Sequence, residues 1–253
     1  MAMGEWFEDV SFWSDFYPIM FAEERLRLGA DEAAQVVELA GLTAPAGKAA
    51  LDLCCGPGRH AVPLAQRGMR VTGVDRTSFL LARARERARL AGVDVELVQS
   101  DMREFRRPAA YDLALSLFTS FGYFEAPEDD LRVLRNVRAS LGPRGVFVMD
   151  MVGKECLARS FQRTRSRALP DGTVLIERCE VAGNWTRLDN EWLLIRGDRV
   201  RASRFRLSVY SGRELRDRLL QAGFATVSLH GGLDGAPYGL DAARLVAVAR
   251  VAP

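Results

Sequence analysis

The sequence of 253 residues contains few of the residues that build metal centres or disulfide frameworks. Histidine occurs twice, at His60 and His230, which is too few for a metal cluster. The four cysteines form no C-x-x-C pair, so neither a zinc site nor a disulfide framework is indicated. We therefore predict a protein without a bound metal.

Long apolar runs and an excess of one charge are also missing. No segment approaches the roughly 18 consecutive apolar residues that a membrane span requires. The 35 lysines and arginines nearly balance 33 acidic residues, and the resulting net charge of +2 creates no strong field that would attract nucleic acid. The N-terminus carries acids where a signal peptide has a basic flank and an apolar stretch. These absences predict a cytoplasmic protein that binds neither a membrane nor nucleic acid.

An apolar fraction of 48% is ample for a buried core, and its arrangement indicates the fold class. From Lys48 onward, short apolar strands alternate with helices that end at glycines, and two further strands close the chain. Strands separated by helices of this length form a parallel sheet with helices on both faces. We predict an α/β fold with a doubly wound, Rossmann-like sheet of seven strands. The expected strands are 50–55, 71–75, 95–99, 111–117, 145–151, 225–230 and 243–251.

Two segments depart from this alternation. Residues 1–47 look helical and are rich in aromatic residues, and Asp31 is expected to cap one of the helices. Residues 158–210 contain three β-rich runs with no helix between them, which predicts a late antiparallel β insertion. Ser211 and Glu214 then match the S-x-x-E capping box that starts a helix.

The turn in LDLCCGPGRHA is where we expect a ligand, because a strand runs there into Gly56, Pro57 and Gly58. Glycines let the backbone approach a ligand closely, and the helix that follows offers free N–H groups. Asp75 and Asp101 end the next two predicted strands. The carboxyl ends of parallel strands share one edge of a sheet, so these residues should meet in one site.

Two kinds of cofactor fit this pattern. Gly56, Gly58 and Ala61 match G-x-G-x-x-G/A, the fingerprint of a nicotinamide dinucleotide site, so an NAD(P)-dependent oxidoreductase is one candidate. Asp52, four residues before Gly56, speaks against it, because its carboxylate would repel a pyrophosphate. A ligand with a positive centre and an amino acid tail would be favoured by that carboxylate.

The segments D-L-C-C-G-P-G, V-T-G-V-D and Q-S-D-M, in this order, resemble the class I S-adenosylmethionine-dependent methyltransferases of the bacterial small-molecule type. The resemblance runs from about Leu51 to the C-terminus. It implies that S-adenosylmethionine is the cofactor, with its ribose on Asp75, its adenine flanked by Asp101 and Met102, and its methionine part on the glycine turn above Asp52. The cofactor-binding set implied is Asp52, Cys54, Gly56, Gly58, Asp75, Arg76, Asp101, Met102 and Leu117.

The segment LFTSFGYF, residues 117–124, is similar to a run in small-molecule methyltransferases, some of which act on amines. The N/D-P-P-Y/F motif that DNA amino-methyltransferases place here is absent. The resemblance therefore implies methyl transfer to a small molecule by in-line displacement, with nitrogen preferred over oxygen because no convincing base is present. A non-catalytic cofactor-binding scaffold is the alternative. The candidate catalytic and acceptor-site residues are Tyr17, Phe118, Tyr123 and His230, of which His230 is the candidate base.

The resemblance also implies a domain organisation. Residues 1–47 would form an N-terminal lid segment, and residues 48–253 would form the S-adenosylmethionine-binding domain. The insertion, residues 158–210, would cover the acceptor site. Its alternative role is to form a homodimer, because an exposed strand edge needs a partner.

Overall fold

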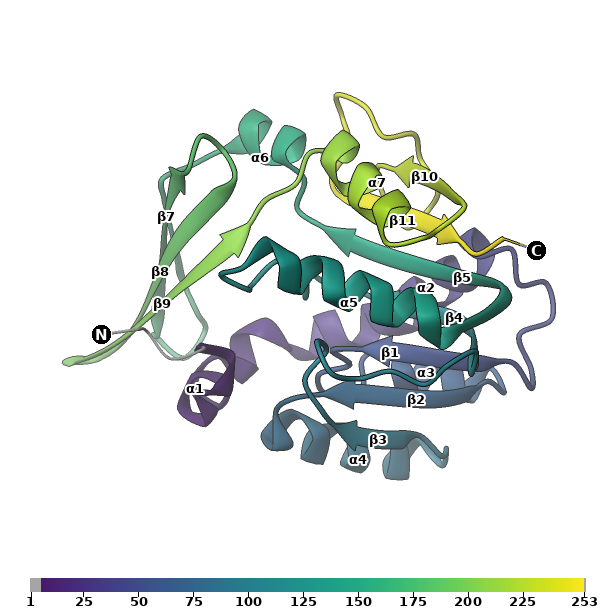
Figure 1. The fold of residues 1–253 in the computed structure, drawn as a ribbon. Coiled ribbons are helices and arrows are strands. Elements are labelled where there is room, and N and C mark those ends of the chain that lie inside the picture. The colour runs from purple at the N-terminus through teal and green to yellow at the C-terminus, as the bar shows by residue number, and fades with distance from the viewer. Residues whose placement is uncertain (1–5, 253) are drawn as a thin grey trace.

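A computed structural model of the protein describes residues 6–252 as two β-sheets with flanking helices (Figure 1). The large sheet has seven strands in the order β10-β11-β5-β4-β1-β2-β3. The pairs from β5 to β3 are parallel, whereas β11 runs antiparallel to both of its neighbours. The predicted doubly wound α/β fold is confirmed. Its strands are β1 (Ala49–Leu53), β2 (Arg70–Asp75), β3 (Glu96–Gln99), β4 (Tyr111–Ser116), β5 (Leu141–Met151), β10 (Thr226–His230) and β11 (Leu245–Arg250).

Helices cover both faces of the large sheet because successive strand residues point to opposite faces. Leu51 and Leu53 of β1 share one buried cluster with Leu134 of α5 and Leu215 of α7, which lie in front of the sheet in Figure 1. Ala50 of β1 belongs to a second cluster on the other face, with residues of α2 and α3. The helices are α1 (Val10–Met20), α2 (Glu23–Leu39), α3 (Ala61–Gln66), α4 (Ser78–Ala91), α5 (Pro127–Ser140), α6 (Lys154–Ser160) and α7 (Gly212–Gln221), with a short 3-10 helix, η1 (Trp6–Glu8), before α1.

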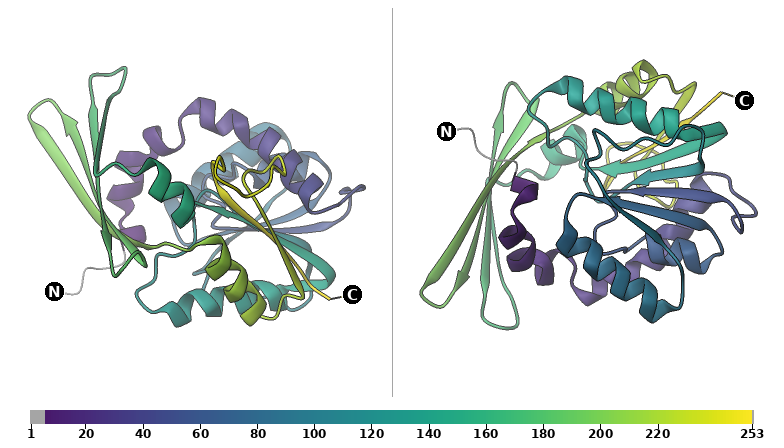
Figure 2. Two further views of the ribbon diagram at one scale, coloured as in Figure 1. Left: turned by 90° about the horizontal axis from the view of Figure 1, so that it is seen from above. Right: turned by 60° about the horizontal axis from the view of Figure 1, so that its bottom comes forward.

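The second sheet is antiparallel and lies beyond one end of the large sheet, with α1 beside it (Figures 1 and 2). Phe12 and Phe16 of α1 are buried against Leu175 and Leu194, so the first helix of the chain completes the core of this sheet. Its strands fall inside the predicted insertion, 158–210. They are β6 (Thr164–Ala168), β7 (Val174–Ala182), β8 (Arg187–Arg196) and β9 (Arg199–Ser208).

Two elements differ from the prediction. The helix expected from Asp31 begins at Glu23, because Gly29 does not interrupt it. A Cβ atom at Gly29 would lie 2.3 Å from the carbonyl oxygen of Arg59, so the glycine lets α2 lie against the turn after β1. Strand β6 was not predicted, since all five of its residues are exposed and show no alternation. It is held by main-chain pairing with β7.

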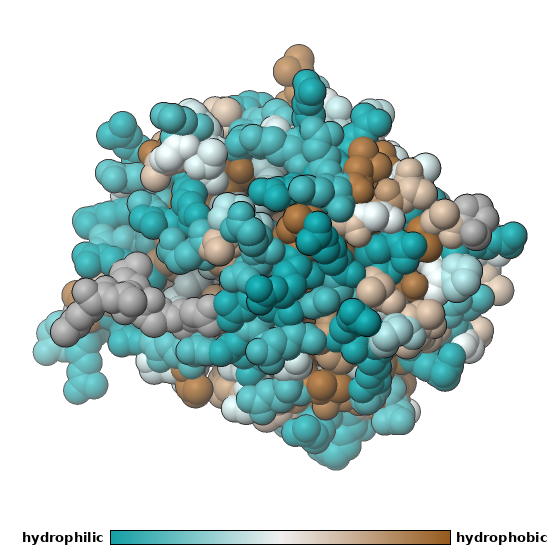
Figure 3. All heavy atoms as spheres, in the orientation of Figure 1, coloured by the Kyte–Doolittle hydropathy of each residue, from teal (hydrophilic) through white to brown (hydrophobic). Residues whose placement is uncertain are grey.

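The surface bears on the remaining expectations. None of the helices in the described part of the chain is long and apolar enough to cross a membrane. The face drawn in Figure 3 is mostly hydrophilic, with hydrophobic residues scattered over it. Within residues 6–252, no three His, Cys, Asp or Glu side chains are grouped so that they could hold a metal ion.

Candidate active site

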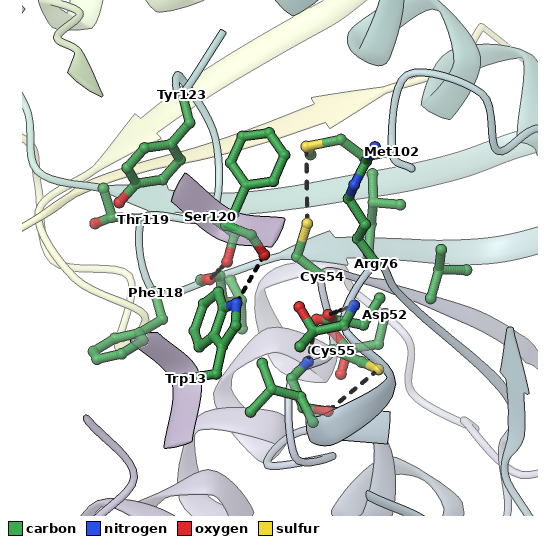
Figure 4. A pocket seen from close by; sticks show the side chains of 18 of the residues that line it. Trp13, Asp52, Cys54, Cys55, Arg76, Met102, Phe118, Thr119, Ser120 and Tyr123 are labelled. Atoms are coloured by element: carbon green, nitrogen blue, oxygen red, sulfur yellow. Dashed lines mark hydrogen bonds between the residues drawn. The ribbon is translucent and has the colours of Figure 1, made fainter. Parts of the chain in front are cut away.

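A cavity opens at the carboxyl ends of β1, β2 and β4, where the sequence predicts the ligand site. Its walls come from three parts of the chain: the strand ends, the loop after β4, and the N-terminal segment. In the view of Figure 4, Phe118 and Tyr123 lie on one side, and Cys54 lies opposite them with Met102. The predicted site residues that line the cavity are Asp52, Cys54, Gly56, Asp75, Arg76, Asp101, Met102, Leu117, Phe118 and Tyr123.

The glycine turn is shaped by left-handed backbone conformations. Gly56 and Gly58 have φ values of 53° and 75°, which glycine adopts without steric cost. Cys54 also has a positive φ of 62°, and β1 ends at Leu53, two residues earlier than the sequence suggests. Gly58 lies outside the cavity lining. A Cβ there would lie 3.2 Å from the Cβ of Ala84, so this glycine permits close packing of the turn on α4.

Asp75 fixes the turn to the end of β2. Its two carboxylate oxygens accept hydrogen bonds from the backbone N–H groups of Gly56 and Thr77, each at 2.9 Å. Burial raises the pKa of Asp75, although these hydrogen bonds oppose the shift. A carboxylate oxygen accepts more than one hydrogen bond, so Asp75 retains capacity for hydroxyl donors in the cavity.

Asp52 is 1% exposed, and its Oδ2 atom has no hydrogen-bond partner among the described residues. Burial raises its pKa to about 6, against the opposing effect of the nearby charges of His60 and Arg59. A buried carboxylate without a partner is costly, so the site favours a ligand that brings a positive charge or a donor to it. This orphaned oxygen fits the cationic cofactor that the resemblance implies.

Asp101 is held between two arginines. Arg103 donates to it from its backbone N–H at 2.7 Å and from its guanidinium, and Arg76 forms an ion pair with it. Burial acts to raise the pKa of Asp101, but these contacts outweigh it and the pKa is lowered. Arg76 also pairs with Glu8 of the N-terminal segment, so it connects that segment to the rim of the cavity.

The loop after β4 turns sharply at Phe118 and Thr119, whose φ values are 65° and 56°. Two consecutive residues in this conformation are strained unless other contacts hold them. The N–H of Phe118 donates to the carboxylate of Asp150, and the N–H of Thr119 donates to the backbone oxygen of Asp150 at 3.1 Å. Arg244 in turn forms an ion pair with Asp150 at 2.6 Å. Asp150 and Arg244, which were not predicted from the sequence, support the loop from β5 and from the segment before β11.

His60 and Arg59 follow the glycine turn and share one partner. The Nε2 atom of His60 lies 2.8 Å from Glu32 of α2, and Arg59 forms an ion pair with the same carboxylate at 2.6 Å. Both basic residues are buried and line the cavity. Helix α2 therefore orients the two side chains that flank the turn.

Two predicted residues lie elsewhere. The Tyr17 ring packs on Phe79 of α4 at 5.7 Å between ring centres, outside the cavity lining. His230 ends β10, and its Nδ1 atom lies 3.2 Å from the backbone oxygen of Gly235, again outside the lining. The structure thus brings neither residue to the other candidates, and their predicted roles find no support in this geometry.

Aromatic residues of the N-terminal segment supply a wall that the predicted residue set did not include. The Trp6 ring lies 5.1 Å from that of Tyr123, and Phe7 lies 6.1 Å from Phe124. Trp13 also lines the cavity, and its indole N–H donates to the backbone oxygen of Phe7 at 2.8 Å. The signal in the sequence for this wall was the density of aromatic residues before the first strand. The sequence could not show which cavity they cover.

Comparison with known proteins agrees with this arrangement. Residues 50–145 match the family model described as "Methyltransferase domain". The dTDP-3-amino-3,4,6-trideoxy-alpha-D-glucopyranose N,N-dimethyltransferase of Streptomyces venezuelae is 29% identical over 140 residues, which are 54% of this chain and 56% of that protein. A ubiquinone biosynthesis O-methyltransferase of Actinobacillus pleuropneumoniae is 28% identical over 43% of this chain and 47% of its own length. The chain thus spans about half the length of the curated relatives it matches.

A solved structure extends the likeness in fold to almost the whole chain. The CcbJ methyltransferase from Streptomyces caelestis superimposes with a TM-score of 0.77 at 23% identity, over 89% of this chain and 95% of that one. In this chain, the large sheet carries Asp52, Asp75 and Asp101 at its carboxyl edge. Residues 50–145 therefore belong to the methyltransferase-domain family, in a chain with the fold of the class I S-adenosylmethionine-dependent methyltransferases.

Proposed function

We propose that the protein transfers the methyl group of S-adenosylmethionine to a small molecule, with nitrogen preferred over oxygen as the methylated atom. The observation that carries this proposal is the convergence of Asp52, Asp75 and Asp101 on one cavity whose other walls are aromatic. The names of two relatives support the class of reaction, because one is an amino-sugar N,N-dimethyltransferase and the other an O-methyltransferase.

The residues of the cavity divide into those that would hold the cofactor and those that would orient the acceptor. Asp75 would accept hydrogen bonds from the ribose hydroxyls, Asp101 and Met102 would flank the adenine, and Asp52 would balance the positive charge. When bound, S-adenosylmethionine supplies a methyl group activated by a sulfonium. Phe118 and Tyr123 would align the acceptor and exclude water, which is the main task of a protein in such a transfer.

The preference for nitrogen follows from the groups near the cavity. A neutral amine needs little help to lose its proton, whereas a hydroxyl acceptor needs a base. Burial raises the pKa of Tyr123, and His230 lies outside the cavity lining. Oxygen is the second candidate because His60, a residue of the type that most often serves as a general base, lines the cavity beside Glu32.

The first test is calorimetric titration of the whole protein with S-adenosylhomocysteine and, separately, with NAD. We expect micromolar binding of S-adenosylhomocysteine alone. Binding of NAD instead would overturn the proposal in favour of an oxidoreductase. Transfer of labelled methyl from S-adenosylmethionine to a panel of amines and phenols then separates N- from O-methylation. Failure to label any acceptor, with cofactor bound, would favour the scaffold.

The role of Asp75 can be tested by Asp75→Ala, which should weaken S-adenosylhomocysteine binding at least tenfold, because charge-assisted hydrogen bonds to the ribose are lost. Asp75→Asn keeps the shape of the side chain but only one acceptor oxygen, so it retains at most one of the bonds to Gly56 and Thr77 and shows how much these backbone bonds contribute. The matched control is Asp94→Ala on the exposed turn before β3, which should bind normally. Unchanged affinity in folded Asp75→Ala would place the ribose elsewhere.

A further inference from the structure

A second hollow borders the candidate active site at Phe118. It shares Arg59, Leu117 and Phe118 with the first cavity. Its other lining residues come from α1 and α2, from the end of β5, from β6 and from the segment before β11. It therefore lies at the carboxyl ends of β4 and β5. Asp75 and Asp101, the predicted ribose and adenine contacts, line only the first cavity.

Four arginines from distant parts of the chain line this hollow. They are Arg25 of α2, Arg59 of the glycine turn, Arg167 of β6 and Arg244 before β11. Three acidic side chains accompany them: Glu24, Glu32 and Asp150. With all seven side chains ionised, the hollow carries one net positive charge.

Two of the four arginines have a carboxylate partner in the hollow. Arg59 forms an ion pair with Glu32, and Arg244 forms one with Asp150, both at 2.6 Å. For Arg25 and Arg167, the part of the chain described by the structure offers no carboxylate within salt-bridge distance.

The contacts of Arg25 show that it is held towards the hollow. Its guanidinium lies 4.6 Å from the centre of the Phe118 ring, and that of Arg59 lies 5.0 Å from the same ring. Partial burial lowers the pKa of Arg25, and so do the charges of Arg59, Arg167 and Arg244. Like charges brought together cost free energy, more so at the partly buried Arg25 and the buried Arg59 than at the exposed Arg167, and a bound anion would offset that cost.

We propose that this arginine hollow binds an acidic group, phosphate or carboxylate, of the methyl acceptor. Guanidinium groups bind such oxyanions with paired, charge-assisted hydrogen bonds. An acceptor anchored here by its acidic group lies against Phe118, with its remaining part directed towards the first cavity. The inference rests on the proposed function, and it assigns β6 of the insertion a residue in the acceptor site.

The test is calorimetric titration of the whole protein with pyrophosphate and with malonate, at constant ionic strength because salt screens such contacts. Each titration is done with and without saturating S-adenosylhomocysteine. We expect one of the two anions to bind at a single site with equal affinity in both conditions, and its identity distinguishes phosphate from carboxylate. The double substitution Arg25→Gln/Arg167→Gln should weaken anion binding tenfold or more and leave the affinity for S-adenosylhomocysteine unchanged.

The matched control is Arg27→Gln/Arg199→Gln, which removes two exposed arginines, one from the same helix and one from β9, the opposite edge strand of the small sheet. It should bind the anion like the wild-type protein. Absence of binding by both anions, or equal affinity in the Arg25/Arg167 variant, would overturn the inference. Displacement of the anion by S-adenosylhomocysteine would also overturn it, because the arginines would then hold the carboxylate of the cofactor. A protein that binds the anion but not S-adenosylhomocysteine would contradict the proposed function, and this result differs from those that would overturn the anion site.

Discussion

Asp52 combines two properties that seldom occur in one side chain of a stable domain. It is almost fully buried, and one of its oxygens lacks a partner within residues 6–252. Its pKa of about 6 in the folded protein exceeds the ordinary value of 3.8, so folding binds a proton between these two pH values. The ionised carboxylate therefore lowers stability above pH 6, and this cost disappears below about pH 4.

Replacing this residue should separate stability from cofactor recognition. Asp52→Asn should raise the free energy of unfolding at pH 7 by about 1 to 3 kcal/mol, since each pKa unit corresponds to about 1.4 kcal/mol. The gain should fade as the pH drops from 6 to 4, as measured by urea unfolding at several pH values. The same variant should bind S-adenosylmethionine more weakly, with less effect on S-adenosylhomocysteine, which lacks the sulfonium charge. Equal losses for both ligands would contradict the assigned role of the charge.

At the scale of elements, α2 determines how the glycine turn is oriented. Its close approach to Arg59 depends on Gly29, and its Glu32 holds both Arg59 and His60. The sequence places these residues some thirty positions apart, and the contact is made because α2 and α3 lie on the same face of the sheet. The first cavity and the arginine hollow both include Arg59, so a displacement of α2 would alter both.

Gly29→Ala should therefore reduce stability by about 1 to 3 kcal/mol, because the added methyl group would meet the backbone of Arg59. Alanine favours an isolated helix over glycine by about 1 kcal/mol, so an effect of local helix preference alone would have the opposite sign. Urea unfolding measures the difference, with Asp31→Ala on the exposed side of the same helix as the control. A stabilised Gly29→Ala protein would show that α2 can move away from the turn at little cost.

On the scale of the whole molecule, the two sheets are joined through the N-terminal segment. Helix α1 packs on the small sheet through Phe12 and Phe16, and Trp6 and Phe7 reach the loop after β4. The four tryptophans all belong to this part of the structure. They are Trp6, Trp13, Trp185 and Trp192. Tryptophan fluorescence therefore reports on the small sheet and α1, whereas far-ultraviolet circular dichroism reports on all helices and strands.

This distribution makes the connection between the sheets measurable. We expect fluorescence and circular dichroism to give the same unfolding midpoint in the wild-type protein. Phe16→Ala should remove about 3 to 5 kcal/mol from the packing of α1 on the small sheet, since Phe16 is fully buried there. Its fluorescence transition should then precede the transition seen by circular dichroism. Val10→Ala, on the exposed side of α1, is the control. Coincident midpoints in Phe16→Ala would mean that the two sheets unfold as one unit.

Much of this architecture could be predicted from the sequence because it depends on local rules. Apolar runs, glycine turns and helical spacing gave the seven strands of the large sheet and their alternation with helices. Chain direction then brought Asp52, Asp75 and Asp101 to one edge, because parallel strands end on the same side. The capping box of Ser211 and Glu214 is present at the start of α7.

What could not be predicted depends on contacts between distant segments. Tyr17 lies outside the cavity because it packs on α4, and His230 does so because β10 is an edge strand of the large sheet. Neither arrangement leaves a signal in the sequence. The four arginines of the hollow come from four different segments of the chain, and no regular spacing in the sequence relates them. Strand β6 could not be predicted from its side-chain pattern either, since only its backbone takes part in pairing.

The packing of α1 on the small sheet also determines the order in which the protein can be completed during translation. Phe12 and Phe16 are synthesised more than 150 residues before Leu175 and Leu194, which bury them. While the residues between them are made, the nascent chain therefore carries an uncovered aromatic helix. Exposed apolar surface on incomplete chains promotes aggregation and chaperone binding. Helix α1 is thus buried only after the insertion has emerged, and the walls of the cavity that the N-terminal segment supplies are assembled no earlier.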